Sequence, residues 1–205
     1  MHNQKNIVTK IKDIYLNKDL RVGGFYELTI QVCRSSNMEP IKKYTEYIKS
    51  LKNVDGPFER NFELTNIEIE TFEHEWVLNL ENVSIPFKTF NIHEDEPIET
   101  GFNWFDICFY TETIEQLFGE EYKTWDENPK CPPALNDFFN QTIMNLNNIH
   151  KFQLAMIDFE ISGQYYLADM GKDFNNWTNS NFFVNEKDAH LISERNKTVV
   201  EIISG

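Results

Sequence analysis

Hydrophobic and polar residues alternate strictly along residues 25–32, so that one set of side chains is apolar and the intervening set is polar. Alternation with a period of two is typical of a strand with one face against a core. The apolar positions are Tyr26, Leu28, Ile30 and Val32, and the polar positions are Glu27, Thr29 and Gln31. On either side of this strand, apolar residues recur at helical spacing over residues 4–17 and 38–53, which predicts two amphipathic helices.

Residues 61–91 carry further strand signals. Residues 61–71 predict a strand whose phase slips once, as at a β-bulge. Residues 74–91 predict a β-hairpin that turns at Glu81 and Asn82, because apolar residues on the two arms match across that turn. Pro86 has no N–H to donate to a neighbouring strand and is expected on a sheet edge.

The second half of the chain repeats the alternation of strands and helices. Residues 102–110 predict a strand, and residues 133–149 predict a helix that starts at its proline. Residues 152–169 predict a strand, a Ser162-Gly163 turn and a return strand. Residues 189–203 predict a final hairpin.

The stretches FYELTIQ (25–31) and WFDICFY (104–110) share an aromatic-aromatic-acid-aliphatic pattern, and a helix and a strand follow each. This doubled βαβ order predicts an α+β fold of the ferredoxin-like type, an antiparallel sheet with helices on one face. A β-hairpin is inserted into that core and a second hairpin extends it at the C-terminus. One domain is expected, made of an N-terminal helix (1–20), a core (21–170) and a C-terminal extension (171–205).

Charged residues are distributed unevenly along the chain. The formal net charge is −14. Residues 1–54 carry ten Lys or Arg and five Asp or Glu, whereas residues 55–127 carry 19 acids against Arg60, Lys88 and Lys123, a net of −16. A field of this sign repels nucleic-acid phosphates and accelerates association with basic proteins. A solvated acidic surface that only keeps the protein soluble is the alternative explanation.

Three cysteines, Cys33, Cys108 and Cys131, are widely spaced and contain no C-x-x-C pair, which favours reduced thiols in the cytoplasm. The first residues have no apolar core of the signal-peptide type, and no apolar run is long enough for a membrane span. Glycine-rich phosphate-binding motifs and the G-x-S-x-G elbow are absent from the sequence. No cofactor is therefore expected.

Two histidines near acidic residues are candidate metal ligands: His74 in TFEHEW and His93 in HEDEPIE. The predicted hairpin places His74 opposite Thr89 and His93 opposite Glu70, about 13 Å apart along the ladder. One ion held at about 2.1 Å from each nitrogen cannot bridge that distance. We therefore expect no metal site here, and we expect HEDEPIE to be an exposed acidic loop.

An enzymatic alternative rests on four carboxylates of the predicted sheet. Glu27 and Asp106 occupy matching positions of the two similar strands, and Asp158 and Glu160 alternate with apolar neighbours. If the open face of the sheet were concave, these acids would converge and serve as a general acid and base or as ligands of a divalent ion. The alternative function is a carboxylate-based hydrolase or a metal-dependent enzyme.

The main expectation is a non-enzymatic, acidic cytoplasmic protein that binds a basic protein partner, with no nucleic-acid or membrane binding. An inhibitor or immunity protein that neutralises a toxin such as a nuclease has this type of surface. Trp125 is the expected aromatic anchor. The acidic interface residues around it are Glu94, Asp95, Glu96, Glu99, Glu120, Glu121, Asp126 and Glu127.

Overall fold

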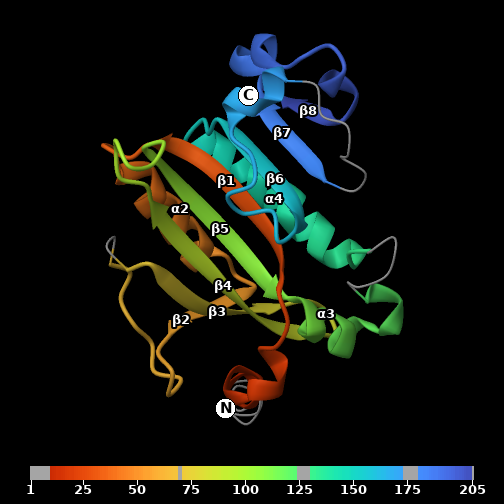
Figure 1. Ribbon diagram of the computed structural model, residues 1–205. Coiled ribbons are helices and arrows are strands. Elements are labelled where there is room, and N and C mark those ends of the chain that lie inside the picture. The colour runs from red at the N-terminus through yellow and green to blue at the C-terminus, as the bar shows by residue number, and fades with distance from the viewer. Residues whose placement is uncertain (1–9, 69–70, 124–129, 173–179, 205) are drawn as a thin grey trace.

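A computed structural model shows an α+β protein built on one eight-stranded sheet, with strands in the order β2-β3-β4-β5-β1-β6-β7-β8 (Figure 1). It describes residues 10–68, 71–123, 130–172 and 180–204. All neighbouring strands are antiparallel except β7 and β8, which are parallel. The strands are β1 (Phe25–Arg34), β2 (Val54–Phe58), β3 (Glu73–Asn79), β4 (Ser84–His93), β5 (Phe102–Tyr110), β6 (Leu154–Phe159), β7 (Asn181–Asn185) and β8 (Val200–Ile203).

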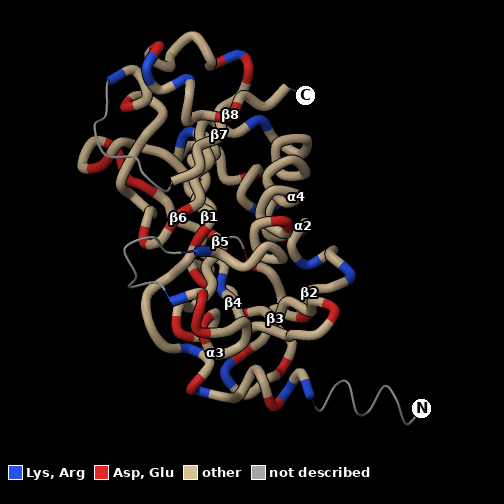
Figure 2. The backbone as a smooth tube through the Cα atoms, turned by 90° about the vertical axis from the view of Figure 1, so that its right-hand side faces the viewer, with Lys and Arg blue, Asp and Glu red and all other residues tan. Residues whose placement is uncertain are grey.

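Two amphipathic helices, α2 (Glu39–Ser50) and α4 (Pro133–Ile149), pack on one face of the sheet. Figure 2 shows both helices on the same side of the strands. Their apolar stripes meet the apolar positions of β1 predicted above, all of which are buried. Many of the contacts in this core are between aromatic rings, such as Phe109 with Phe139 at 5.6 Å between centroids. A shorter helix, α3 (Thr111–Phe118), follows β5, and residues 10–16 are also helical.

The predicted hairpin is formed by β3 and β4 with the expected register, in which His74 pairs with Thr89. This hairpin lies between β5 and β2 in the sheet. The strands of the two predicted βαβ units therefore do not form one uninterrupted sheet, because β3 and β4 separate β2 from β5. The structure therefore confirms a mixed α+β fold with a mostly antiparallel sheet but does not confirm the ferredoxin-like topology. Pro86 lies on β4, an internal strand, so the expectation of an edge strand was wrong. Pro86 has no pairing partner on β5, because the pairing of β4 with β5 begins only at Phe87. Pro86 therefore needs no N–H on that side of the strand.

Three other sequence-based elements differ from the structure. Residues 61–68 form a loop with one isolated bridge, and the strand of this region is β2 at residues 54–58. The expected return strand after Ser162 is a turn followed by the 3-10 helix η3 (Leu167–Gly171). No C-terminal hairpin forms, because β8 pairs in parallel with β7 after a crossover through η4 (Glu186–Leu191) and η5 (Asn196–Thr198).

The second face of the sheet is covered in two places. At one end the chain after β6, through η3, packs with β7, β8 and η4–η5 around an apolar cluster that includes Trp104, Met156 and Met170. Near the other end, Ile11 and Tyr15 of the helical residues 10–16 pack on Phe58 and Val77. Between these two parts, over β4 and β5, the same face is more open. None of the described helices is long and apolar enough to cross a membrane.

The helical residues 10–16 are held to the sheet edge by a buried tyrosine. Tyr15 is 1% exposed, and its hydroxyl contacts Glu75 Oε2 at 2.5 Å and the Glu59 carbonyl at 2.9 Å. Arg21 Nη1 also contacts Glu75 Oε2, at 2.6 Å, and its guanidinium lies over the Tyr15 ring. Burial acts to raise the pKa of Glu75, but the hydrogen bonds from Tyr15 and Arg21 hold it below its ordinary value.

Removing the Tyr15 hydroxyl tests this attachment. Tyr15→Phe keeps the ring contacts but removes its hydrogen bonds, so we expect the free energy of unfolding at pH 7 to fall by about 1–2 kcal/mol. Urea unfolding followed by circular dichroism measures the change. Lys12→Ala, at an exposed position of the same helical segment, is the control and should have little effect. Equal stability of Tyr15→Phe and wild type would show that the hydroxyl is not what holds the segment.

Candidate functional site

The polar row of β1 lies on the sheet face opposite α2 and α4, and it is buried. Glu27, Thr29 and Gln31 are 3%, 0% and 1% exposed. In the register with β5, Thr29 pairs with Asp106 and Glu27 pairs with Cys108. Residues at paired positions share a face, so Glu27 and Asp106 are diagonal neighbours on adjacent strands near the middle of the sheet. Asp106 is itself only 2% exposed.

Ser162, in the turn that follows β6, links both carboxylates to the segment that covers them. Its backbone N–H donates to Glu27 Oε1 at 2.6 Å, and its hydroxyl donates to Asp106 Oδ2 at 2.8 Å. The Thr29 hydroxyl also donates to Asp106, and Cys108 Sγ lies 3.3 Å from Glu27 Oε2. These donors are all neutral, so the hydrogen bonds satisfy the carboxylates without compensating their charge.

Two buried acids this close repel each other when both are ionised. Burial, and after it the charge of Glu27, raises the pKa of Asp106 to about 7, although the hydrogen bonds from Thr29 and Ser162 act to lower it. Burial also raises the pKa of Glu27, against hydrogen bonds from Ser162 and Cys108. Near neutral pH Asp106 is therefore partly protonated, whereas an ordinary exposed carboxylate is fully ionised.

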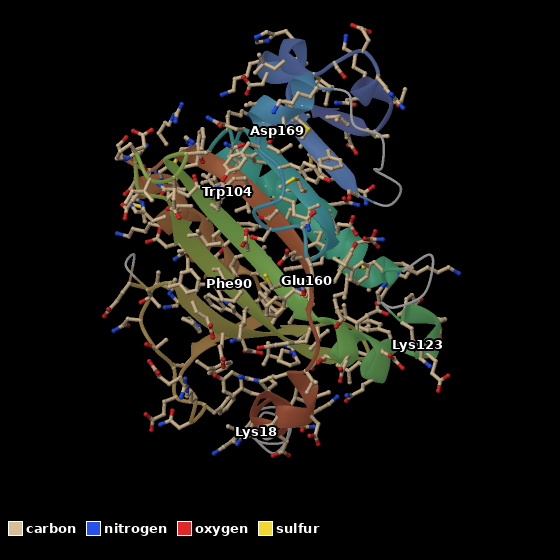
Figure 3. The ribbon with its side chains drawn as sticks, in the orientation of Figure 1. Lys18, Phe90, Trp104, Lys123, Glu160 and Asp169 are labelled. Atoms are coloured by element: carbon tan, nitrogen blue, oxygen red, sulfur yellow. The ribbon has the colours of Figure 1, made fainter. Side chains whose placement is uncertain are left out.

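The carboxylates line a recess of about 220 Å³ on the open part of the sheet face. Its other lining residues are apolar or lie in the turn after β6: Phe25, Phe72, Phe90, Ile92, Glu160 and Ser162. Phe90 is at the centre of the aromatic part, 5.3 Å from Phe72 and 6.0 Å from Phe25 between ring centroids. Phe72 is 56% exposed and belongs to the rim, whereas Glu27 and Asp106 are buried and form the floor. Figure 3 shows Phe90 and Glu160 on the same face of the sheet, from β4 and from the end of β6.

Three of the four sheet carboxylates selected from the sequence meet at this recess: Glu27, Asp106 and Glu160. Glu160 accepts a hydrogen bond from the backbone N–H of Phe25, and its side chain lies so close to Gly24 that a Cβ there would be 2.1 Å from Glu160 Oε1. Asp158 is opposite Glu27 on β6 but accepts hydrogen bonds from Ser180 and from the Phe159 backbone instead. It does not line the recess.

A larger groove, of about 690 Å³, lies between the ends of β1 and β5 and the segment around η3. Arg34 stacks on Phe102 there, 4.3 Å from the ring centroid, and also contacts Glu96 and the Thr100 carbonyl. The charged side chains of this groove, Arg34 and Asp169, are both already paired, Asp169 with Lys172. The smaller recess therefore holds the more unusual chemistry.

His74 and His93, the two candidate metal ligands, have different surroundings in the structure. His74 is 2% exposed against Trp76, its ring nitrogens have no hydrogen-bond partner, and burial lowers its pKa. His93 Nδ1 lies 2.9 Å from Asn103 Oδ1, and its Nε2 lies 3.5 Å from Asp95. Among the described residues, no group of three His, Cys, Asp or Glu side chains is arranged to hold a metal ion. The three cysteines are free thiols.

The acidic residues selected as a partner interface fall into two separate groups. Asp95, Glu96 and Glu99 are exposed in the loop before β5, whereas Glu120 and Glu121 are exposed after α3, beyond the other end of β5. The strand β5, which is nine residues or about 26 Å long, lies between the two groups in the chain. Figure 1 shows the loop before β5 and the end of α3 at opposite ends of this strand. The other selected residues, Trp125, Asp126 and Glu127, lie outside the described residues.

Glu94, the remaining residue of that selection, is 8% exposed and serves the fold. Its carboxylate accepts hydrogen bonds from Trp104 Nε1 at 2.8 Å, Tyr166 Oη at 2.9 Å and the Phe102 backbone N–H at 3.0 Å, and a further one from Thr100. Burial acts to raise the pKa of Glu94, but these donors hold it below its ordinary value. Glu94 therefore links the loop before β5 to the segment around η3.

Sequence reasoning missed the aromatic walls and Ser162. Phe25 and Phe90 have the appearance of ordinary strand residues, and Phe72 lies between two strand signals. The available signal was the polar row of β1 itself, because a strand in the middle of a sheet is seldom polar on one face unless something satisfies that face.

Replacing Glu94 with glutamine, the corresponding amide, tests its role in the fold. Glu94→Gln keeps the shape but removes the charge that four donors share, so we expect the free energy of unfolding at pH 7 to fall by about 1–3 kcal/mol. Because the folded state lowers the pKa of Glu94, its contribution is complete above the unfolded pKa and is lost as the pH falls through the folded pKa. Urea unfolding at pH 7 and pH 3 should show a larger difference from wild type at pH 7 than at pH 3. Glu96→Gln, in the same loop with a side chain 62% exposed, is the control and should match wild type at both pH values.

Comparisons of the chain with protein-family models, with curated proteins and with solved structures found no match in any of the three.

Proposed function

We propose that the protein binds a basic protein partner through the open part of the sheet face, and that the recess receives a lysine or arginine side chain of that partner. The observation that carries the proposal is the buried pair Glu27 and Asp106 under three phenylalanine rings. Carboxylates attract a cation, and aromatic faces stabilise an ammonium or guanidinium group by about 0.5–2 kcal/mol each.

No basic side chain of the described chain already occupies the recess. Lys88 is on the same sheet face, but its ammonium contacts Glu73 at 2.5 Å and Glu75 at 3.7 Å. Among the ion pairs of the described residues, none includes Glu27, Asp106 or Glu160. The negative charge of the recess is therefore left for an external cation.

The exposed acids supply a second, longer-range contribution. Figure 2 shows Asp and Glu positions gathered around β4 and α3. Exposed charges mainly increase the rate of association with a basic partner, whereas a desolvated pocket controls how slowly the complex dissociates. A toxin with a basic active site, such as a nuclease, is the class of partner that fits, and the protein would act as its inhibitor or immunity protein in the cytoplasm.

Capture from the cell lysate, with matched variants of the protein as bait, tests this function. We expect a basic protein to be retained by wild type at moderate salt and to be lost with Phe72→Ala, which removes an exposed ring of the recess. Ile202→Ala, at a 39% exposed position on the distant strand β8, is the control and should retain the same protein. Mass spectrometry quantifies the retained proteins. Equal retention by wild type and Phe72→Ala would exclude the recess as the binding site.

Hydrolysis is a second candidate function, and one observation favours it. A general acid or base works best when its pKa lies near the working pH, and the pKa of Asp106 is raised to about 7 beside Glu27. In this reading Asp106 and Glu27 exchange a proton with a substrate bound in the recess.

The hydrolase reading predicts release of nitrophenol by wild type from a panel of nitrophenyl glycosides, esters and phosphates. Asp106→Asn should abolish that turnover, whereas Asp158→Asn should retain it, because Asp158 is outside the recess. Activity that survives Asp106→Asn would rule out this mechanism.

A further inference from the structure

We infer that the recess exchanges a proton for its cationic ligand: entry of a lysine ammonium ionises the Glu27–Asp106 pair, and the proton is released to solvent. This inference rests on the proposed function and adds to it that binding depends on pH. It follows from how the two carboxylates are buried, from the neutrality of their donors and from the charges around them.

The hydrogen bonds around the pair suit both protonation states. The Ser162 hydroxyl donates to Asp106 Oδ2 when Asp106 is ionised. A hydroxyl both donates and accepts, so it can accept instead when Asp106 is protonated. The Ser162 backbone N–H remains on Glu27 in either state. The turn can therefore keep its position over the pair while the proton leaves, and the recess does not have to unfold.

The ionisable groups around Asp106 are predominantly acidic. They come from the neighbouring strands and from the covering turn: Glu27 on β1, Cys108 on β5, Asp158 on β6, Lys88 on β4 and Glu160 after β6. Lys88, the single cation of this set, is in register with Cys108 and is paired with Glu73 and Glu75. In the absence of a ligand, a proton is therefore the species that relieves the repulsion within the pair.

The exchange balances in charge and atoms. The singly protonated pair and an ammonium group combine to give the doubly ionised pair in contact with the ammonium, plus one free proton. An ammonium in contact with the pair favours its ionised form and so lowers the pKa of Asp106 in the complex. In the free protein that pKa is about 7. Affinity should therefore rise with pH up to about 7 and become constant above it.

A lysine analogue, Nα-acetyl-lysine N-methylamide, is the probe, because its ammonium stays charged throughout this pH range. Binding is measured by NMR titration, which detects millimolar dissociation constants, with the amide signal of Ser162 as reporter. We expect the Kd at pH 6 to be about tenfold higher than at pH 8, as one proton with a pKa of about 7 requires. The corresponding norleucine analogue, which has no charge, should not bind.

Two variants separate the role of Asp106 from a general charge effect. Asp106→Asn cannot release the proton. At pH 8 its Kd should therefore be higher than that of wild type, and its own Kd values at pH 6 and pH 8 should be nearly equal. Asp158→Asn removes an acid on the same sheet face but outside the recess, and it should keep the tenfold ratio. Because ionisation of Asp106 beside Glu27 opposes folding, Asp106→Asn should melt at pH 8 no earlier than wild type, which checks that it is folded.

Each outcome decides a different point. Wild-type binding with equal Kd values at pH 6 and pH 8 would overturn the proton exchange and leave the proposed function in place. A tenfold ratio that persists in Asp106→Asn would overturn the assignment to Asp106. A lysine analogue that does not bind at pH 8 would overturn the inference, since the recess would then accept no ammonium. The proposed function is tested separately by partner capture: it fails if wild type retains no basic protein, or if the retention is insensitive to Phe72→Ala.

Discussion

Strand β1 is paired with a neighbour on each side and lies in the middle of the sheet, yet its residues Glu27, Thr29 and Gln31 are polar and buried. Because these three side chains have little contact with water, most of their hydrogen bonds must come from the protein. The segment after β6 meets this requirement. Its Ser162 binds Glu27 and Asp106, and its Leu167 donates a backbone N–H to Gln31 Oε1 at 2.8 Å.

The same segment is tied to the loop before β5 through Glu94 and Tyr166. One set of polar contacts thus places the covering turn, closes one side of the recess and orders the acidic loop. An apolar β1 would pack the sheet without such demands, because replacing buried ionic groups with apolar ones often stabilises a fold. A pair of acids buried without a counter-charge is expensive for the fold, and sites of this kind are where function is most often found.

The negative charge of the chain consequently has two parts with different physical effects. Exposed acids such as Glu96 and Glu120 are solvated and screened, so they act over distance and contribute little per contact. Glu27 and Asp106 are buried, so a cation in contact with them would interact far more strongly. The proposed binding of a basic partner combines the two effects, because exposed acids would attract the partner over distance and the recess would hold one of its side chains.

The sequence by itself determined several of the local elements, although not the strand expected at 61–71 or the hairpin expected at 189–203. The alternation in 25–32 and the helical stripes of 38–53 and 133–149 are period signals that local backbone geometry imposes, and the structure has β1, α2 and α4 there. The register of the β3–β4 hairpin follows from its turn in the same way. The order of the strands does not, because the position of the hairpin between β5 and β2 depends on contacts between segments far apart in the chain.

The recess shows the same division. Period-two polarity identified Glu27, Asp106, Asp158 and Glu160 as residues of one face, but only the tertiary structure separated Asp158 from the other three and placed Phe72 beside Phe90. Charge counting could not tell the buried Glu94 from the exposed Glu96 two residues later. Residue type and spacing are written in the sequence. How distant segments pack over the carboxylates decides which of them lose contact with water. That loss raises the pKa of a carboxylate and strengthens its interaction with a cation.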